Sequence, residues 1–223
     1  MCASYGLQAP DEGAAFGIKP MDTREGRATI AEWSGMWGGK ANITREQKAG
    51  LNLNPIIRVP PVEATRSIAL AWWWFHIGGR PAKYTAFNSR DDTLLTKWKQ
   101  GFQHRALLPA TWYMEGKKQW QLPSGEPFAI AAILSSRTLP DGSTGFAYSL
   151  VTREGIGEAS TVVTARGDSR MPLVLPHDLH DEWLNPERPG DESLVAAVQE
   201  GSVDISLAMT TNAPTNESQL AFF

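Results

Sequence analysis

The 223-residue chain carries a formal net charge of −3 and a single cysteine, so an intramolecular disulfide framework is excluded and a reducing compartment is favoured. Its longest apolar runs, residues 68–75 and 128–134, are far too short to span a bilayer, and no charged-then-apolar leader opens the sequence. We therefore expect a cytoplasmic protein (bacterial cytosol or nucleoid-associated) without a membrane partner. We also expect a monomer with a single domain over residues 1–223.

The first half of the sequence mixes short extended segments with two helices. Turn-forming Gly and Pro residues punctuate the apolar runs and set the boundaries. A second helix is expected to begin at Asp91 or Asp92, which can cap it. The expected elements are a helix over 28–37 ended by Gly38 and Gly39, an extended segment over 51–59, a buried strand over 67–75, a loop over 78–88 and a helix from 91 or 92 to about 102.

The second half is dominated by short strands with turn signals between them, the pattern of a curved sheet or barrel. The fold class predicted is therefore α+β, with a curved, largely antiparallel sheet or partly closed barrel flanked by a few helices. The expected strands cover 106–114, 128–134, 146–152, 161–164 and 171–175. They are followed by helices over 177–184 and 191–200, the latter capped by Asp191, a closing strand over 205–210 and a polar tail, so that 204–223 closes the domain.

Basic residues gather in the middle of the chain. Residues 58–118 hold ten Lys and Arg against four acidic residues, a net +6 that leaves −9 for the rest. This distribution is compatible with a local groove for a polyanion, or with an ordinary solvated surface. Near it, Trp73 and Trp74 are candidates to stack on bases, although core packing is the more common role of tryptophan.

The sequence begins Met1-Cys2-Ala3, and Cys2 is the only cysteine. Removal of Met1 would leave an α-amine and a thiol on one residue. The amine can form an imine with an aldehyde, and the thiol can close on the imine carbon as a thiazolidine. An α-amine titrates at about 7.7–8.0, so a useful neutral fraction exists near neutral pH. The alternative is an inert buried cysteine.

Several short motifs together resemble the SOS response-associated peptidase (SRAP) family. They are the Met1-Cys2 start, residues 52–55 (NLNP), 87–93 (FNSRDDT), 108–115 (LPATWYME) and 170–175 (RMPLVL). Each motif alone is weakly specific, but they fall in the family's order from residue 1 to about 185. The resemblance implies recognition of abasic sites in single-stranded DNA, a covalent link from Cys2 to the sugar aldehyde, and autocatalytic exposure of Cys2.

The resemblance also implies roles for individual residues. Cys2 would be the nucleophile, Asn88 would orient it, and Glu115 would handle protons while the sugar opens and the imine forms. Arg90 and Arg170 would grip flanking phosphates. These residue types suit the tasks, because a carboxylate can exchange protons with the amine and arginine forks match phosphate geometry.

Two departures from the family pattern affect the site. Asp168 stands where the family usually carries a histidine, and Ala3-Ser4 replaces Gly-Arg. If Asp168 lies close to Glu115, the two carboxyls would share a proton and one pKa would rise. We therefore expect modest DNA affinity and an acid–base role for Asp168.

The sequence leaves other functions open. His177 and His180 suggest a metal site, but no third ligand lies near them, so neither a metal nor another cofactor is expected. An alternative enzyme is an N-terminal-Cys amidohydrolase or self-processing peptidase that uses Glu115 and Asp168 as acid–base groups. A catalytically idle DNA-binding relic is the third possibility.

Overall fold

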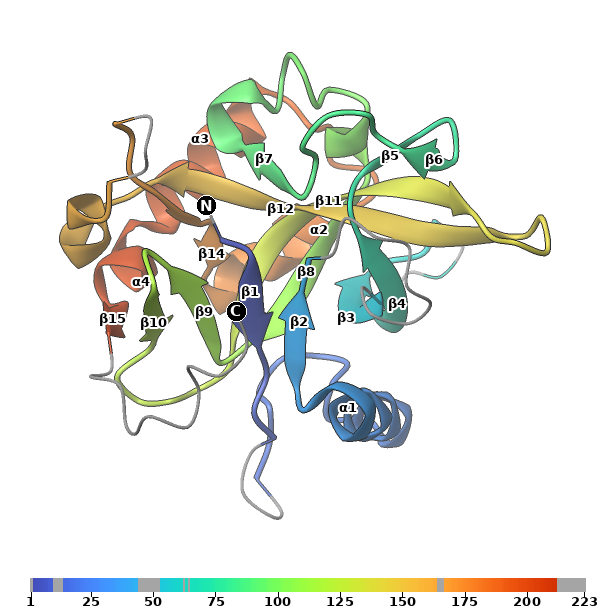
Figure 1. Ribbon diagram of the computed structural model, residues 1–223, viewed down its shortest axis with the longest axis horizontal. Helices are drawn as coiled ribbons and strands as arrows, with labels where there is room; N and C mark the ends of the chain where they lie inside the picture. Colours follow the sequence, from blue (N-terminus) through green and yellow to red (C-terminus); the bar gives the residue numbers. More distant parts are fainter. Residues whose placement is uncertain are drawn as a thin grey trace.

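Two β-sheets form the centre of the molecule, and helices cover its outer faces (Figure 1). The computed structural model describes residues 2–9, 14–43, 53–61, 63, 65–163 and 167–211. The strands are β1 (Ser4–Gly6), β2 (Lys40–Asn42), β3 (Leu53–Arg58), β4 (Ser67–Trp73), β5 (His76–Ile77), β6 (Arg80–Pro81), β7 (Asn88–Arg90), β8 (Arg105–Ala110), β9 (Trp112–Glu115), β10 (Lys118–Gln121), β11 (Phe128–Thr138), β12 (Thr144–Glu154), β13 (Arg170–Pro172), β14 (Val174–Leu175) and β15 (Thr210–Thr211). The helices are α1 (Arg24–Trp37), α2 (His180–Leu184), α3 (Glu192–Gly201) and α4 (Val203–Leu207), with 3-10 turns η1 (Asp91–Thr93), η2 (Gly101–Gln103), η3 (Gly157–Thr161) and η4 (His177–Leu179).

The larger sheet closes into a five-stranded barrel. Its strands follow the order β12-β4-β3-β8-β11, and β11 pairs again with β12 to complete the ring. Strand β12 runs parallel to β4 and to β7, whereas the remaining pairs of this sheet are antiparallel. Closure leaves no free edge between these five strands. The expected α+β class with a partly closed, mostly antiparallel barrel is confirmed.

The smaller sheet has the order β15-β10-β9-β1-β2, with antiparallel neighbours throughout. Strand β1 therefore lies between β9 and β2, although it belongs to the first residues of the chain. Tyr5 stands opposite Tyr113, so continuing this register by two residues puts Ala3 opposite Glu115. The sheet thus carries the N-terminus to the end of β9.

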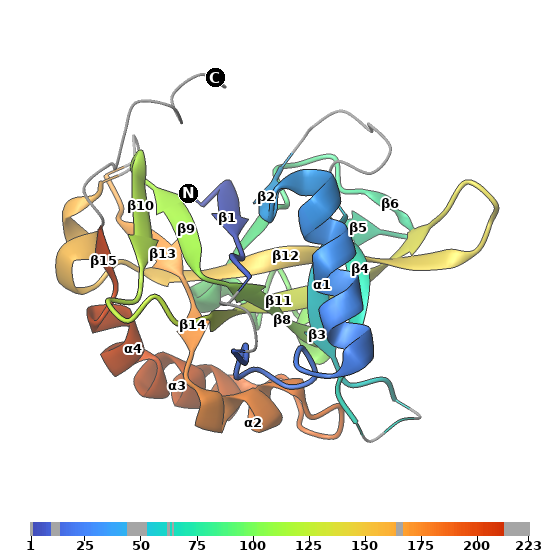
Figure 2. The same ribbon diagram turned by 90° about the horizontal axis from the view of Figure 1, so that it is seen from below.

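The helices lie on different sides of the barrel. Figure 2 shows α1 beside β3 and β4, and α2, α3 and α4 together along another face. Helix α1 begins at Thr23, whose hydroxyl accepts from the Gly26 amide at 3.0 Å, and ends at Gly38 in the left-handed region. None of the helices in the described ranges is long and apolar enough to cross a bilayer.

The expected helix from Asp91 to about Phe102 is wrong. The segment forms η1 and η2 with turns between them. Of the four apolar residues that a helix would place on one face, Leu94, Trp98 and Phe102 are buried, but Leu95 is 37% exposed. Neither candidate cap is available, because Asp91 pairs with Arg170 and Asp92 with Arg90. Tertiary ion pairs have therefore replaced the helix cap.

Other differences lie at strand boundaries. The expected strand over 106–114 is divided at Thr111 into β8 and β9, which belong to different sheets, and the loop over 78–88 contains β6. The expected closing strand over 205–210 is wrong: helical bonds such as Ser206 N to Ser202 O, 3.1 Å, continue through α4, and only β15 follows. At 161–164, η3 and a bridge at Val163 replace the strand. The predictions for residues 51, 52, 164 and 212–223 lie outside the described residues.

Candidate active site

Cys2 lies two residues before the start of β1 and is completely buried. Its thiol donates a hydrogen bond to the Ser4 carbonyl oxygen, with 3.4 Å between sulfur and oxygen. Burial, and then the negative charge of Glu115, raise the pKa of the thiol to about 12. Cys2 is therefore a neutral thiol at physiological pH.

Asn88 reaches Cys2 from the other sheet. It opens β7, which is held in place by its parallel pairing with β12, where Asn88 stands opposite Leu150. The Asn88 amide Nδ2 donates to the Cys2 carbonyl oxygen at 2.8 Å. Its Oδ1 is buried and accepts no hydrogen bond from the part of the chain that is described. One end of the side chain thus fixes the Cys2 backbone, while the other keeps an acceptor capacity.

Glu115 ends β9 and is 6 % exposed. The two residues that follow, Gly116 and Lys117, both have positive φ (60° and 62°), which gives the tight turn into β10. A Cβ on Gly116 would lie 2.1 Å from a Val162 methyl carbon, so only glycine fits there. Burial raises the pKa of the Glu115 carboxyl above its ordinary value, and the charge of Asp168 raises it further. A raised pKa brings the titration of this carboxyl closer to neutral pH than that of an exposed glutamate, which favours a role in proton exchange.

Arg90 and Asp168 meet at the edge of the site. Arg90 Nη1 lies 3.3 Å from Asp168 Oδ2, while its Nε and Nη2 donate to both oxygens of Asp92 at 3.0 and 2.5 Å. The Arg90 side chain is half exposed. The charge of Asp168 acts on Glu115, and the side chain of Asp168 contacts Arg90. A phosphate at Arg90 would compete with two carboxylates.

Arg170 is placed differently from Arg90. Its side chain is 6 % exposed, and Nη2 donates to Asp91 Oδ1 at 2.9 Å and to the Thr152 carbonyl at 2.5 Å. The second oxygen of Asp91 accepts from Gln199 at 2.8 Å. Arg170 thus joins η1, β12 and α3 through a buried ion pair, and this guanidinium is not exposed to a ligand.

The two candidate tryptophans take part in packing. Trp73 is fully buried, its ring stacks on Tyr148 with centroids 5.9 Å apart, and its Nε1 donates to the Phe87 carbonyl at 2.9 Å. Trp74 is half-buried, and its Nε1 donates to the Ala82 carbonyl at 3.1 Å. The burial of Trp73 argues for core packing at that position, whereas Trp74 keeps part of its surface.

A pair of buried phenols, Tyr5 and Tyr148, was not identified from the sequence, and their ionisation is affected by Cys2. The hydroxyls of Tyr5 and Tyr148 lie 2.8 Å apart, and Asn54 Nδ2 donates to the Tyr148 oxygen at 3.0 Å. Burial raises the pKa of both phenols far above the ordinary value. Asn54 belongs to the NLNP motif, which is the one signal that could have pointed to this network.

The basic segment 58–118 does not form one groove. Arg105 is buried and donates to the carbonyl oxygens of Trp183 and Phe102 at 2.6 and 2.7 Å, and Arg66 pairs with Asp181 at 2.6 Å. Lys97 lies over the ring of Tyr84 at 4.2 Å. These three cations are used at separate places, and the burial of Arg105 gives it a structural role rather than a place in a groove.

The structure also locates the two histidines considered as metal ligands. His180 is buried, and its Nε2 lies 3.1 Å from the Leu175 carbonyl, so the ring anchors α2 to β14. Within the described ranges, no group of three or more His, Cys, Asp or Glu side chains is arranged to hold a metal ion.

The fold holds β1 inside a sheet and brings Asn88 and Glu115 to Cys2 from two directions. The family described as SOS response associated peptidase (SRAP) matches residues 1–211, and the chain belongs to this family.

Among curated proteins, the chain is similar to the abasic site processing protein YoqW of Bacillus subtilis (strain 168) and to the protein of that name in Bacillus phage SPbeta. Each is 24% identical over 151 residues, which is 60% of this chain and 65% of the relative. The chain thus aligns with somewhat less than two thirds of these relatives' length.

Solved structures with the same fold come from Bordetella bronchiseptica. One is 17% identical with a TM-score of 0.61, and the alignment covers 96% of this chain and 100% of that protein's chain. The other, a phage-related protein of the same organism, is 16% identical with a TM-score of 0.61, and the alignment covers 97% of this chain and 95% of that protein. At these identities the likeness establishes the fold.

Proposed function

We propose that this protein processes abasic sites in DNA by binding single-stranded DNA and linking its processed N-terminal Cys2 covalently to the aldehyde of the abasic sugar. The observation that carries the proposal is the convergence on Cys2 of Asn88, which bonds its carbonyl at 2.8 Å, and of Glu115, whose charge acts on its thiol. Membership of the SRAP family and the names of the Bacillus relatives support it.

The reaction needs Met1 to be removed, which the amidohydrolase chemistry of the same site can supply by hydrolysing the bond before Cys2. The freed amine of Cys2 attacks the open-chain aldehyde carbon, and loss of one water gives an imine. The thiol sulfur then adds to the imine carbon, and the thiol proton ends on the nitrogen. The product is a thiazolidine, and no oxidant or reductant is consumed.

In the proposed reaction, Glu115 carries out the proton transfers. Its raised pKa favours the protonated form, which can donate to the departing water, and the ionised form can accept a proton from the amine. The buried Oδ1 of Asn88 is an acceptor of the right kind for the N–H of that amine. Asp168 contacts Arg90 and reduces the net positive charge there.

A single strand is the substrate that fits this chemistry, because an unpaired sugar reaches a protein site without disruption of a duplex. Arg90 and Lys117 are exposed beside Asn88 and Glu115. Asp92 and Asp168 already neutralise much of Arg90, so we expect modest affinity and a salt slope of only about 0.7 for each phosphate contacted.

The decisive experiment combines intact mass with a denaturing gel. The purified protein should have lost Met1 and should give a gel-stable adduct with an oligonucleotide that carries one abasic site. Cys2→Ser keeps the α-amine but lacks the thiol, so it should form only a labile imine that borohydride must trap.

The alternatives predict other results. An adduct of Cys2→Ser as stable as the parent's would refute the thiazolidine. Loss of Met1 without any adduct would favour the self-processing peptidase. Full retention of Met1 together with DNA binding would favour the idle relic.

A further inference from the structure

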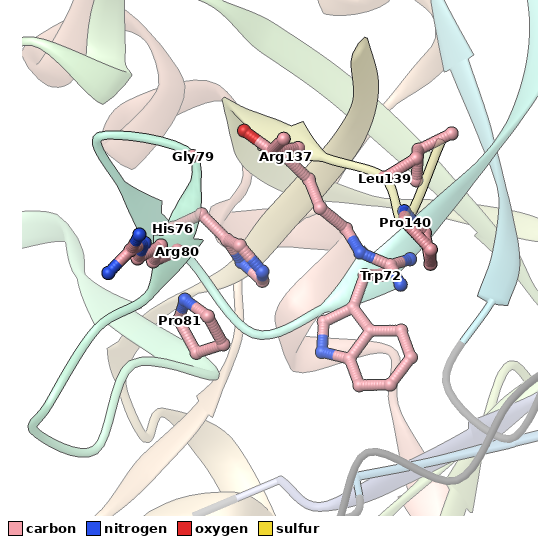
Figure 3. A pocket seen from close by; sticks show the side chains of 9 residues that line it. Trp72, His76, Gly79, Arg80, Pro81, Arg137, Leu139 and Pro140 are labelled. Atoms are coloured by element: carbon pink, nitrogen blue, oxygen red, sulfur yellow. The ribbon is translucent and has the colours of Figure 1, made fainter. Parts of the chain in front are cut away.

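A second basic site lies away from Cys2, in a surface pocket of about 430 Å³ between the β5–β6 turn and the β11–β12 hairpin. Arg137, His76 and Arg80 line it, and Trp72 forms its floor. In Figure 3 the Arg137 guanidinium lies over the Trp72 indole, 4.3 Å from the ring centroid, and the His76 imidazole lies between Arg137 and Arg80.

Among the described residues, the two arginines of this pocket have no acidic partner. Within the described part of the chain, neither Arg80 nor Arg137 forms an ion pair, and the pocket lining contains no acidic side chain. Arg137 is partly desolvated, and burial lowers the pKa of its guanidinium. By contrast, Arg90 at the active site is held by two carboxylates. An uncompensated pair of guanidinium groups in a partly desolvated pocket favours an anion.

The pocket walls are tied together, so the site is preformed. The Gly79 carbonyl accepts from the Thr138 amide at 3.0 Å, and the His76 amide donates to Ser135 Oγ at 2.9 Å. A Cβ on Gly79 would lie 2.2 Å from the Thr138 hydroxyl oxygen, so glycine permits this close approach. His76 is 4 % exposed, and its Nδ1 lies 2.7 Å from the Trp74 carbonyl, which fixes the ring.

The pocket lies within reach of a DNA strand that is bound at Cys2. Asn88 pairs with Leu150 of β12, and Arg137 pairs with Gly145 of the same strand. Five residues at about 3.3 Å each separate these positions by about 17 Å. Figure 2 shows β1 and the β5–β6 turn on the same side of β12.

We infer that this pocket binds a backbone phosphate of the same DNA strand, several nucleotides from the abasic site held at Cys2. The inference rests on the proposed function and adds the extent of the bound strand. The 3.4 Å rise per phosphate along one strand of a duplex is a lower bound for an extended single strand, so about 17 Å corresponds to at most about five nucleotides. One face of Trp72 is covered by Arg137 and the side chain is only 5 % exposed, so the pocket recognises phosphate rather than a stacked base.

The test compares two single strands with a reduced, unreactive abasic site at the centre, one of about four and one of about sixteen nucleotides. The Arg80→Ala/Arg137→Ala variant should bind the long strand about tenfold more weakly and lower its salt slope by about 0.7 for each phosphate that it no longer binds. It should bind the short strand like the parent. Arg137→Lys, which keeps the charge, should retain most of the affinity for the long strand.

Arg58 offers a matched control. It also lies over an aromatic ring, 4.3 Å from the centroid of Phe146, but it has the acidic neighbour Glu63 and does not line the pocket. Arg58→Ala should leave both strands unaffected. Crosslinking of the short, aldehyde-bearing strand by the parent tests the proposed function separately.

Three outcomes would overturn the inference. Equal loss for short and long strands would mean that the double variant disturbs the Cys2 site or the fold. No loss for either strand would mean that DNA does not reach the pocket. Weaker binding of inorganic phosphate with unchanged binding of the long strand would assign the pocket to a free phosphate.

Discussion

Replacing Arg170 should destabilise the protein rather than weaken its hold on DNA. The side chains of Arg170 and Asp91 are 6% and 7% exposed and their charged atoms lie 2.9 Å apart. Arg170→Met would leave Asp91 as a buried carboxylate whose remaining donor is Gln199. Breaking one partner of such a pair costs about 3–5 kcal/mol. For a chain of this size, each kcal/mol lowers Tm by about 2–4 °C, so the expected fall is about 6–20 °C.

Thermal or urea unfolding measures this cost, and Arg90→Met is the matched control. Arg90 and Asp92 are about half exposed, so their pair should contribute at most about 1 kcal/mol. The double variant Arg170→Met/Asp91→Asn should recover most of the stability. For DNA binding the order reverses: Arg90→Met should reduce the salt slope and Arg170→Met should not. If Arg170→Met unfolds like the parent and flattens the salt slope, the buried pair is unimportant and Arg170 does contact phosphate.

Two further predictions concern the carboxylates. Burial raises the folded-state pKa of Glu115 above its ordinary 4.5. Its contribution to the free energy of unfolding is therefore full below pH 4.5 and is lost as pH rises through the folded-state pKa. Glu115→Gln should remove this pH dependence of stability and slow single-turnover crosslinking by about 10²–10⁴-fold. Asp92→Asn and Asp168→Asn each release Arg90 from a carboxylate, so both should strengthen binding of the DNA strand. If Asp168 also moves a proton, only Asp168→Asn should slow crosslinking at saturating DNA. Equal crosslinking rates in the two variants would mean that Asp168 acts only through its charge.

Local signals in the sequence identified the elements whose ends depend on neighbouring residues. Asp191 caps α3 through a 3.0 Å bond to the Leu194 amide, and Gly38 ends α1, as expected. The expected helix after Asp91 failed because that carboxylate binds Arg170, which lies 79 residues later in the chain. A capping rule contains no information about such a distant competitor.

The same distinction between local and distant signals applies to the residues of the candidate site. Asn88 and Glu115 were found because they lie in recognisable motifs, and the structure brings both to Cys2. The phenol pair could not be found from the sequence, since Tyr5 and Tyr148 are 143 residues apart and neither belongs to a motif. Arg170 does lie in a motif, yet its burial becomes visible only when β13 is placed against β12.

The pKa of Cys2 bears on the order of the proposed steps. A cysteine that attacks first is normally activated as a thiolate by a nearby cation or a helix N-terminus. Here burial and the Glu115 charge raise the pKa of the thiol to about 12, so thiolate is scarce at neutral pH. A free α-amine, with a pKa of about 7.7–8.0, is then the more available nucleophile. In the proposed mechanism the amine would therefore attack the aldehyde first. The thiol would close the ring only after the imine has formed beside it, because a neutral thiol adds readily only to a carbon already made electrophilic and held next to it.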